Sequence, residues 1–206
     1  MKAAALFARI CDLLRRGDPE AARLLPLLES HAEYAPGWQE LGAVLEEAGH
    51  TQAASVAFSR AAAALAAIER HDPDRALPYA RGQCLRRAGR HAQAVAALEE
   101  ATRRDANFAE AWFALGLARQ DSAGDAAAAF RTALALRPGW HEAALNLGIA
   151  LQEAGEMQPA LTAYGSALQA RPESLARIAQ ALSSARRGML VLDLERLRER
   201  LLTQAG

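Results

Sequence analysis

The sequence is poor in the residues on which sheets and disulfide frameworks depend. Aromatic residues make up 5% of the 206 residues, and β-branched residues are scarce, which disfavours a β-sheet. The two cysteines, Cys11 and Cys84, lie far apart and form neither a CxxC motif nor a metal-ligand spacing. We therefore interpret them as small buried apolar residues of a protein from a reducing compartment.

An excess of one charge and a long apolar run are also missing. The formal net charge is +0 and Lys2 is the only lysine, so the chain has no overall basic field for nucleic acid or an anionic membrane. Arg9 and Asp12 interrupt the N-terminal apolar run too early for a secretion signal. No run is long enough to span a bilayer. We expect a cytoplasmic protein with no nucleic-acid partner and no membrane insertion.

The sequence is rich in alanine and contains a repeat. Alanine supplies about a quarter of the residues, and because it has the highest helix propensity, this composition favours packed helices. The clearest repeat unit spans residues 141–174. Its landmarks are Leu147-Gly148, Leu151, Ala154-Gly155, Ala160, Tyr164, Ala167 and Pro172.

This pattern resembles the tetratricopeptide repeat, whose 34-residue unit carries W-x2-L-G-x2-Y, then A-x3-F, then P. Three earlier units, residues 35–74, 75–108 and 109–140, carry matching landmarks in the same register. Residues 1–34 look like a degenerate N-terminal repeat with its turn at Gly17-Asp18-Pro19. Residues 175–206 look like a C-terminal capping helix pair hinged near Gly188. The last helix of that pair should face the repeats through four leucines: Leu190, Leu194, Leu197 and Leu201.

The resemblance implies an all-α fold, a right-handed superhelical solenoid of antiparallel helix pairs with about eleven to thirteen helices and no sheet. One glycine recurs in the first helix of each unit, where we expect a close helix crossing to compensate for its low helix propensity. These glycines are Gly42, Gly82, Gly116 and Gly148. The unit at 35–74 is six residues longer than the family period, so we expect its second helix to be extended between Ala61 and Asp74.

Candidate catalytic chemistry is absent from the sequence pattern. No GxGxxG or GKS/T phosphate loop and no HExxH motif is present, and the five histidines are dispersed. Scattered serine and acidic residues do not define a triad. The sequence therefore predicts a protein that is not an enzyme and that holds no cofactor and no metal.

Charge is distributed unevenly between neighbouring units. Residues 35–74 contain two arginines and six acidic residues, whereas residues 75–108 contain seven arginines and three acidic residues. The two sets are either complementary solvated faces or an acidic groove end beside a basic patch. Arg81 and Arg119 also stand where sister units place leucine. Each head group either reaches solvent at the edge or binds a ligand carboxylate.

In tetratricopeptide arrays the first helices of successive units line the concave face, and the resemblance implies the same arrangement here. Residues one helical turn apart on that face form an apolar strip with polar edges, which suits a bound peptide or helix. The predicted partner-binding residues are Tyr79, Gln83, Arg86, Phe113, Leu117, Gln120, Leu145, Asn146, Ile149 and Gln152. The alternative is that the C-terminal helices fold back over this strip.

These features predict a non-catalytic, bacterial-style scaffold or adaptor that binds a protein or peptide segment in its groove. One alternative is a substrate-recognition module of a transferase-type enzyme that acts in trans or in a longer polypeptide. Another is a self-assembling homo-oligomer, in which an end helix of one molecule docks into the groove of the next.

Overall fold

The computed structural model describes residues 2–72, 74, 76–122, 124–184 and 193–204. These residues form twelve α-helices and two short 3-10 helices, and no strand is found among them. The predicted all-α helical-repeat fold is therefore confirmed. The chain divides into two compact units, Met1–Asp105 and Ala106–Gly206.

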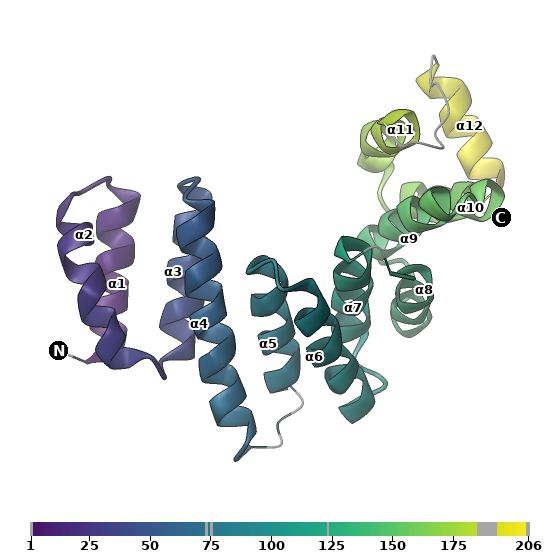
Figure 1. Ribbon diagram of the computed structural model, residues 1–206. Helices are drawn as coiled ribbons and strands as arrows, with labels where there is room; N and C mark the ends of the chain where they lie inside the picture. The colour runs from purple at the N-terminus through teal and green to yellow at the C-terminus, as the bar shows by residue number, and fades with distance from the viewer. Residues whose placement is uncertain (1, 73, 75, 123, 185–192, 205–206) are drawn as a thin grey trace. The chain divides into compact units, whose positions relative to one another are not determined.

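The first unit is a row of helices in which each packs on its neighbours (Figure 1). The turn between its first two helices lies at the predicted Gly17-Asp18-Pro19. The helices of this unit are α1 (Ala3–Arg15), α2 (Glu20–Leu24), the 3-10 helix η1 (Leu25–His31), α3 (Ala35–Glu47), α4 (Thr51–Glu69), α5 (Ala76–Arg87) and α6 (His91–Arg104).

The second unit contains two helix pairs followed by two further helices. In it α7 packs on α8, α9 on α10, and α12 on α10. Its helices are α7 (Ala109–Asp121), α8 (Ala127–Leu136), α9 (His141–Ala154), α10 (Met157–Ala170), the 3-10 helix η2 (Pro172–Ser174), α11 (Leu175–Ser184) and α12 (Leu194–Gln204).

The repeated Ala-Gly landmark marks the end of a first helix. Gly89 and Gly155 have φ values of +74° and +87°, a left-handed conformation that glycine adopts without steric cost. This conformation lets the next amide reach back, so Arg90 N–H donates to the Leu85 carbonyl and Glu156 N–H to the Leu151 carbonyl, both at 2.8 Å. These helix ends have the hydrogen bond of a Schellman motif.

The predicted close crossing at the repeated helix glycines is confirmed. A Cβ at Gly116 would lie 2.5 Å from the Phe130 ring, and one at Gly148 would lie 2.5 Å from the Tyr164 ring. Gly42 and Gly82 contact Phe58 and Leu98 in the same way. In each helix pair, one large side chain of the second helix therefore packs directly on the glycine of the first helix.

The second helix of the long unit is extended, as the surplus residues predict. Helix α4 has 19 residues, and its additional turns bury Ala62, Ala64 and Leu65. Its last residue, Glu69, lies within ion-pair distance of arginines on α5 and α6.

The predicted leucine stripe on the last helix is only partly correct. Leu197 and Leu201 are buried in the same apolar cluster as residues of α10. Leu194, however, is 48% exposed, so it does not face the repeats as predicted. The hinge near Gly188 and the first leucine of the stripe, Leu190, lie outside the described residues.

Candidate partner-binding surface

The predicted binding residues divide between the two units. Tyr79, Gln83 and Arg86 lie on α5 of the first unit, where their spacing of four and three residues places them on one face of the helix. Gln83 is exposed, and the other two are half-buried. The remaining predicted residues lie on α7 and α9 of the second unit.

Five of the predicted residues on α7 and α9 are half-buried and therefore partly open to solvent. The two helices contact each other, so these residues lie on neighbouring elements of one unit. We call this surface the α7–α9 face. Its residues are Phe113, Leu117, Gln120, Asn146 and Ile149.

Phe113 anchors one end of the α7–α9 face. Its ring centroid lies 4.6 Å from that of Trp140, the residue before α9, and 5.7 Å from that of the buried Phe130. The guanidinium of Arg137 covers Trp140 at 4.8 Å from the ring centroid. One side of the ring of this predicted partner-binding residue therefore packs on the inter-helix core.

Two of the predicted binding residues are not on an exposed face. Leu145 is 2% exposed and Gln152 is 1% exposed, so the prediction that both face outward is wrong. Leu145 belongs to the same buried cluster as Ile178 and Leu182 of α11. Helix α11 also contacts α9, so a C-terminal helix lies against part of the predicted strip, which is the alternative that the sequence left open.

Gln152 joins three helices through its side-chain amide. The Tyr164 hydroxyl on α10 donates to its Oε1 at 2.7 Å, and its Nε2 donates to the Ala181 carbonyl on α11 at 3.3 Å. Burial raises the pKa of the Tyr164 hydroxyl well above its usual range, so the hydroxyl stays protonated and donates. One sequence signal could have revealed this contact: Tyr164 stands where sister units have Phe58, Leu98 and Phe130, and a buried tyrosine hydroxyl needs a partner.

Residues 35–74 carry an excess of acidic side chains, and residues 75–108 carry an excess of arginines. Ion pairs within the first unit join some of these opposite charges. Glu46 on α3 pairs with Arg87 on α5. Glu69 on α4 pairs with Arg81 on α5 at 2.8 Å and with Arg104 on α6 at 2.9 Å. These contacts pair acidic side chains of residues 35–74 with arginines of residues 75–108.

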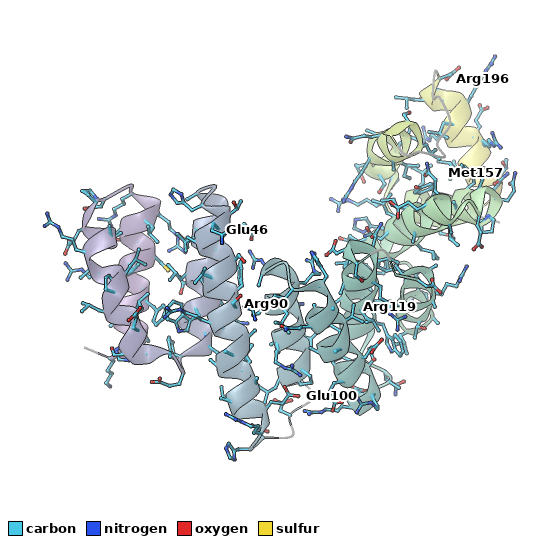
Figure 2. All side chains as sticks on the ribbon, viewed as in Figure 1. Glu46, Arg90, Glu100, Arg119, Met157 and Arg196 are labelled. Carbon is cyan, nitrogen blue, oxygen red and sulfur yellow. The ribbon has the colours of Figure 1, made fainter. Side chains whose placement is uncertain are left out.

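The Glu69 contacts form one end of a larger charge cluster. Arg104 also pairs with Glu100 at 2.7 Å, and the hydrogen bond from Arg104 lowers the pKa of the Glu100 carboxyl. Figure 2 shows Glu46 and Glu100 near opposite ends of the helices of this unit. Arg81 is thus held by a carboxylate of the chain itself, and its side chain is 25% exposed.

Arg119, the second arginine at a leucine position, lies near the C-terminal end of α7 (Figure 2). Its Nη1 lies 3.5 Å from the carbonyl oxygen of Asp125 in the connection to α8. The half-buried side chain therefore reaches the connection at the helix end.

The cysteines are buried, as predicted, and neither forms a disulfide. Burial raises the pKa of the Cys11 thiol to about 11 and also raises the pKa of Cys84. The Gln39 side-chain amide lies 3.2 Å from the sulfur of Cys84. Both thiols are therefore protonated at neutral pH and lack the thiolate character of a reactive cysteine.

The described part of the chain has neither a cluster of metal-ligating side chains nor a helix that could cross a membrane. No group of histidine, cysteine and acidic side chains there has the arrangement of a metal site. No helix there is both long and apolar enough to cross a membrane.

Comparison with known proteins identifies the type of repeat. Residues 79–108 match the family model of the tetratricopeptide repeat. No curated protein matches the sequence. The chain thus carries a tetratricopeptide repeat and has the fold of tetratricopeptide repeat proteins, as its landmarks predict.

Several solved structures share this fold at low sequence identity. MamA residues 41 to the end, from Desulfovibrio magneticus RS-1, is 21% identical over 84% of this chain and 97% of its own, with a TM-score of 0.57. YrrB, described as a tetratricopeptide repeat protein with an unusual peptide-binding site, is 21% identical over 81% and 86%, with a TM-score of 0.53. PilF of Pseudomonas aeruginosa is 20% identical over 98% and 88%, with a TM-score of 0.54.

Proposed function

We propose that the chain is a non-catalytic scaffold that binds a peptide or helix of a partner protein on the α7–α9 face. Helical-repeat folds are typical of protein–protein interaction scaffolds, which offer extended surfaces built from many similar helices. Peptide binding by YrrB supports this use of the fold.

One observation carries the assignment to the α7–α9 face. Phe113, Leu117 and Ile149 pack against the apolar core of the second unit but stay partly open to solvent. Gln120 and Asn146 lie among them on the same two helices. A partly exposed apolar strip with polar neighbours suits a partner that needs apolar anchors and hydrogen bonds to fix its register.

The burial of Leu145 and Gln152 narrows the proposed surface. The partner would lie on α7 and on the half-buried residues Asn146 and Ile149 of α9. Leu145 is buried, and the side chain of Gln152 is hydrogen-bonded to α11. Tyr79, Gln83 and Arg86 form a separate face on α5, which we propose as a second contact for a charged or polar segment.

A partner can be captured at this surface by cross-linking. A photo-reactive amino acid at Gln120 in the full chain should trap the partner in the source cell, for identification by mass spectrometry. With that partner, Ile149→Ala should weaken binding about tenfold, because anchor residues dominate binding energy. Titration calorimetry measures the loss at a temperature where melting curves show the variant folded.

Leu136→Ala is the matched control, because Leu136 is an exposed leucine on α8 of the same unit. It should bind the partner as the unchanged protein does. Normal binding by Ile149→Ala together with loss of binding by Leu136→Ala would place the site elsewhere and refute the proposal.

A further inference from the structure

A second surface lies in the first unit, between η1 and α4, with α3 as its floor. The space has a volume of about 460 Å³, within the rough range of 300–1,000 Å³ that ligand sites occupy. Trp38, Leu41 and Leu45 form the floor, and Leu25 and Val56 lie on opposite walls. We call this space the η1–α4 groove.

The second helix of the first pair is broken where it forms one wall of the groove. Helix α2 ends at Leu24 and continues as the 3-10 helix η1, which has Pro26 in its first turn. Proline has no N–H to continue the α-helical hydrogen bonds, and a 3-10 helix is narrower than an α-helix. The wall that faces α4 is therefore narrower than an α-helix would be.

A large apolar side chain is exposed on the α4 wall. Val56 is 49% exposed, and Leu25 on the η1 wall is half-buried. Exposed apolar side chains around such a space commonly mark interaction sites. The internal packing of the first unit leaves both side chains partly in solvent.

One end of the groove is charged. Arg60 on α4 and Glu29 on η1 approach each other at 3.7 Å, with side chains that are 38% and 73% exposed. The guanidinium of Arg60 also stacks on the floor residue Trp38, 4.8 Å from the ring centroid. Stacking orients the guanidinium, and its long contact with the solvated Glu29 leaves donors for a better-placed carboxylate.

We propose that the η1–α4 groove binds an amphipathic helix of a partner protein, with aliphatic side chains on the floor and a carboxylate at Arg60. The α4 wall presents Ala53, Val56, Ala57 and Arg60, the spacing of one helix face. This face spans about 10 Å at 1.5 Å per residue, which is two turns of an incoming helix. A helix of that length offers anchors at i, i+3 or i+4, and i+7.

A second copy of the chain matches this groove poorly. The exposed leucines of α12, Leu194 and Leu202, are its best candidates for apolar anchors. That helix carries three arginines, Arg196, Arg198 and Arg200, against two glutamates. Its positive balance is unfavourable at Arg60, whereas an acidic partner helix gains a charge-assisted hydrogen bond there.

The test uses a display library of helical peptides selected against the full chain. Selected peptides should carry aliphatic residues at helical spacing and an aspartate or glutamate. In hydrogen exchange they should protect residues 25–31 and 53–60. Val56→Glu should weaken their binding at least about tenfold, and Arg60→Gln about fivefold. Glu29→Gln should strengthen binding about twofold, because it removes the competing carboxylate.

Ile149→Ala separates this proposal from the proposed function, because it alters the α7–α9 face alone and should leave these peptides bound. Selected peptides that bind Val56→Glu and Arg60→Gln normally would overturn the proposal. So would a selection that yields no peptide sensitive to Val56→Glu. Concentration-dependent self-association of the unchanged chain that is lost in Val56→Glu would assign the groove to a second copy and would overturn it as well.

Discussion

At the scale of single residues, the contact between Gly116 and Phe130 decides how closely α7 and α8 approach. Alanine at Gly116 would gain about 1 kcal/mol of helix propensity. Its Cβ, however, would lie 2.5 Å from the Phe130 ring, and such overpacking costs about 1–3 kcal/mol. Because Phe130 is 0% exposed and protein interiors are close-packed, we expect Gly116→Ala to lower the free energy of unfolding by about 1–2 kcal/mol.

Urea denaturation measures this effect, and a double-mutant cycle isolates its cause. In a Phe130→Leu background the added methyl group meets a smaller side chain, so Gly116→Ala should cost clearly less. An equal cost in both backgrounds would show that the ring contact is not the reason for glycine at this position.

The hydroxyl of Tyr164 is the second decisive group at this scale. Tyr164→Phe removes the donor to Gln152 Oε1 and leaves a buried amide oxygen without its partner. We expect a loss of about 1–3 kcal/mol in the free energy of unfolding. The double variant Tyr164→Phe with Gln152→Leu removes both polar partners and should recover part of that loss. A larger loss in the double variant would show that the hydrogen bond from Gln152 to the Ala181 carbonyl contributes more to stability than the bond from Tyr164. Denaturation curves of both single variants and the double variant distinguish these results.

The sequence predicts some of these residues and not others for a physical reason. Gly116 and Phe130 recur at fixed spacing in sister units, and their contact lies within one helix pair, so the pattern contains it. In an array that continued with further repeats, the position of Gln152 would stay open to solvent. Here its burial depends on α11, whose sequence does not show the repeat pattern. Leu145 is also buried, because the spacing of a helix does not show which of its faces a neighbouring helix covers.

At the scale of helices, the extra length of α4 places Glu69 between two arginines. The carboxylate side chain is 11% exposed, and Arg81 and Arg104 are 25% and 27% exposed. Glu69→Gln would leave both guanidinium groups partly buried without their shared carboxylate. We expect it to lower the free energy of unfolding by about 1–2 kcal/mol, because hydrogen bonds between charged groups contribute more when water is partly excluded.

Glu46→Gln is the matched control for this prediction. It breaks the pair with Arg87, whose two side chains are 38% and 47% exposed, and exposed pairs contribute about 0–1 kcal/mol. Thermal melts at low and high salt give both values. If both variants lower the free energy of unfolding equally, the partly buried position of Glu69 does not make its ion pairs stronger than the exposed pair of Glu46.

The surplus of residues in the unit at 35–74 predicted that α4 is long, but not where its last carboxylate would lie. Arg81 shows why: its leucine-like position suggests a buried charge, and its partner lies on the neighbouring repeat's helix. The leucine spacing of α12 likewise predicted a helix but not the rotation of that helix about its own axis. The prediction that Leu194 faces the repeats is therefore wrong. Periodicity identifies elements, whereas contacts between elements depend on packing that the pattern does not contain.

At the scale of the whole molecule, each of the two units has its own buried core. In the second unit the core joins Phe130, Tyr164 and Ile178 with Leu197 and Leu201 of the last helix. In the first unit Phe7, Phe58 and Leu98 are buried in the same way. The two proposed surfaces also belong to different units: the η1–α4 groove lies in the first unit and the α7–α9 face in the second.

Because repeats contact mainly their neighbours, we expect a local defect to weaken one unit more than the other. Gly116→Ala should accelerate amide exchange most within residues 106–184. The matched variant Gly42→Ala, which meets the Phe58 ring at 2.7 Å, should do so most within residues 2–72. Hydrogen exchange followed by mass spectrometry of both variants, under conditions where each is folded, measures the two profiles. Equal acceleration along the whole chain in both variants would mean that the molecule opens as one cooperative body, and the separate cores would then not set its stability.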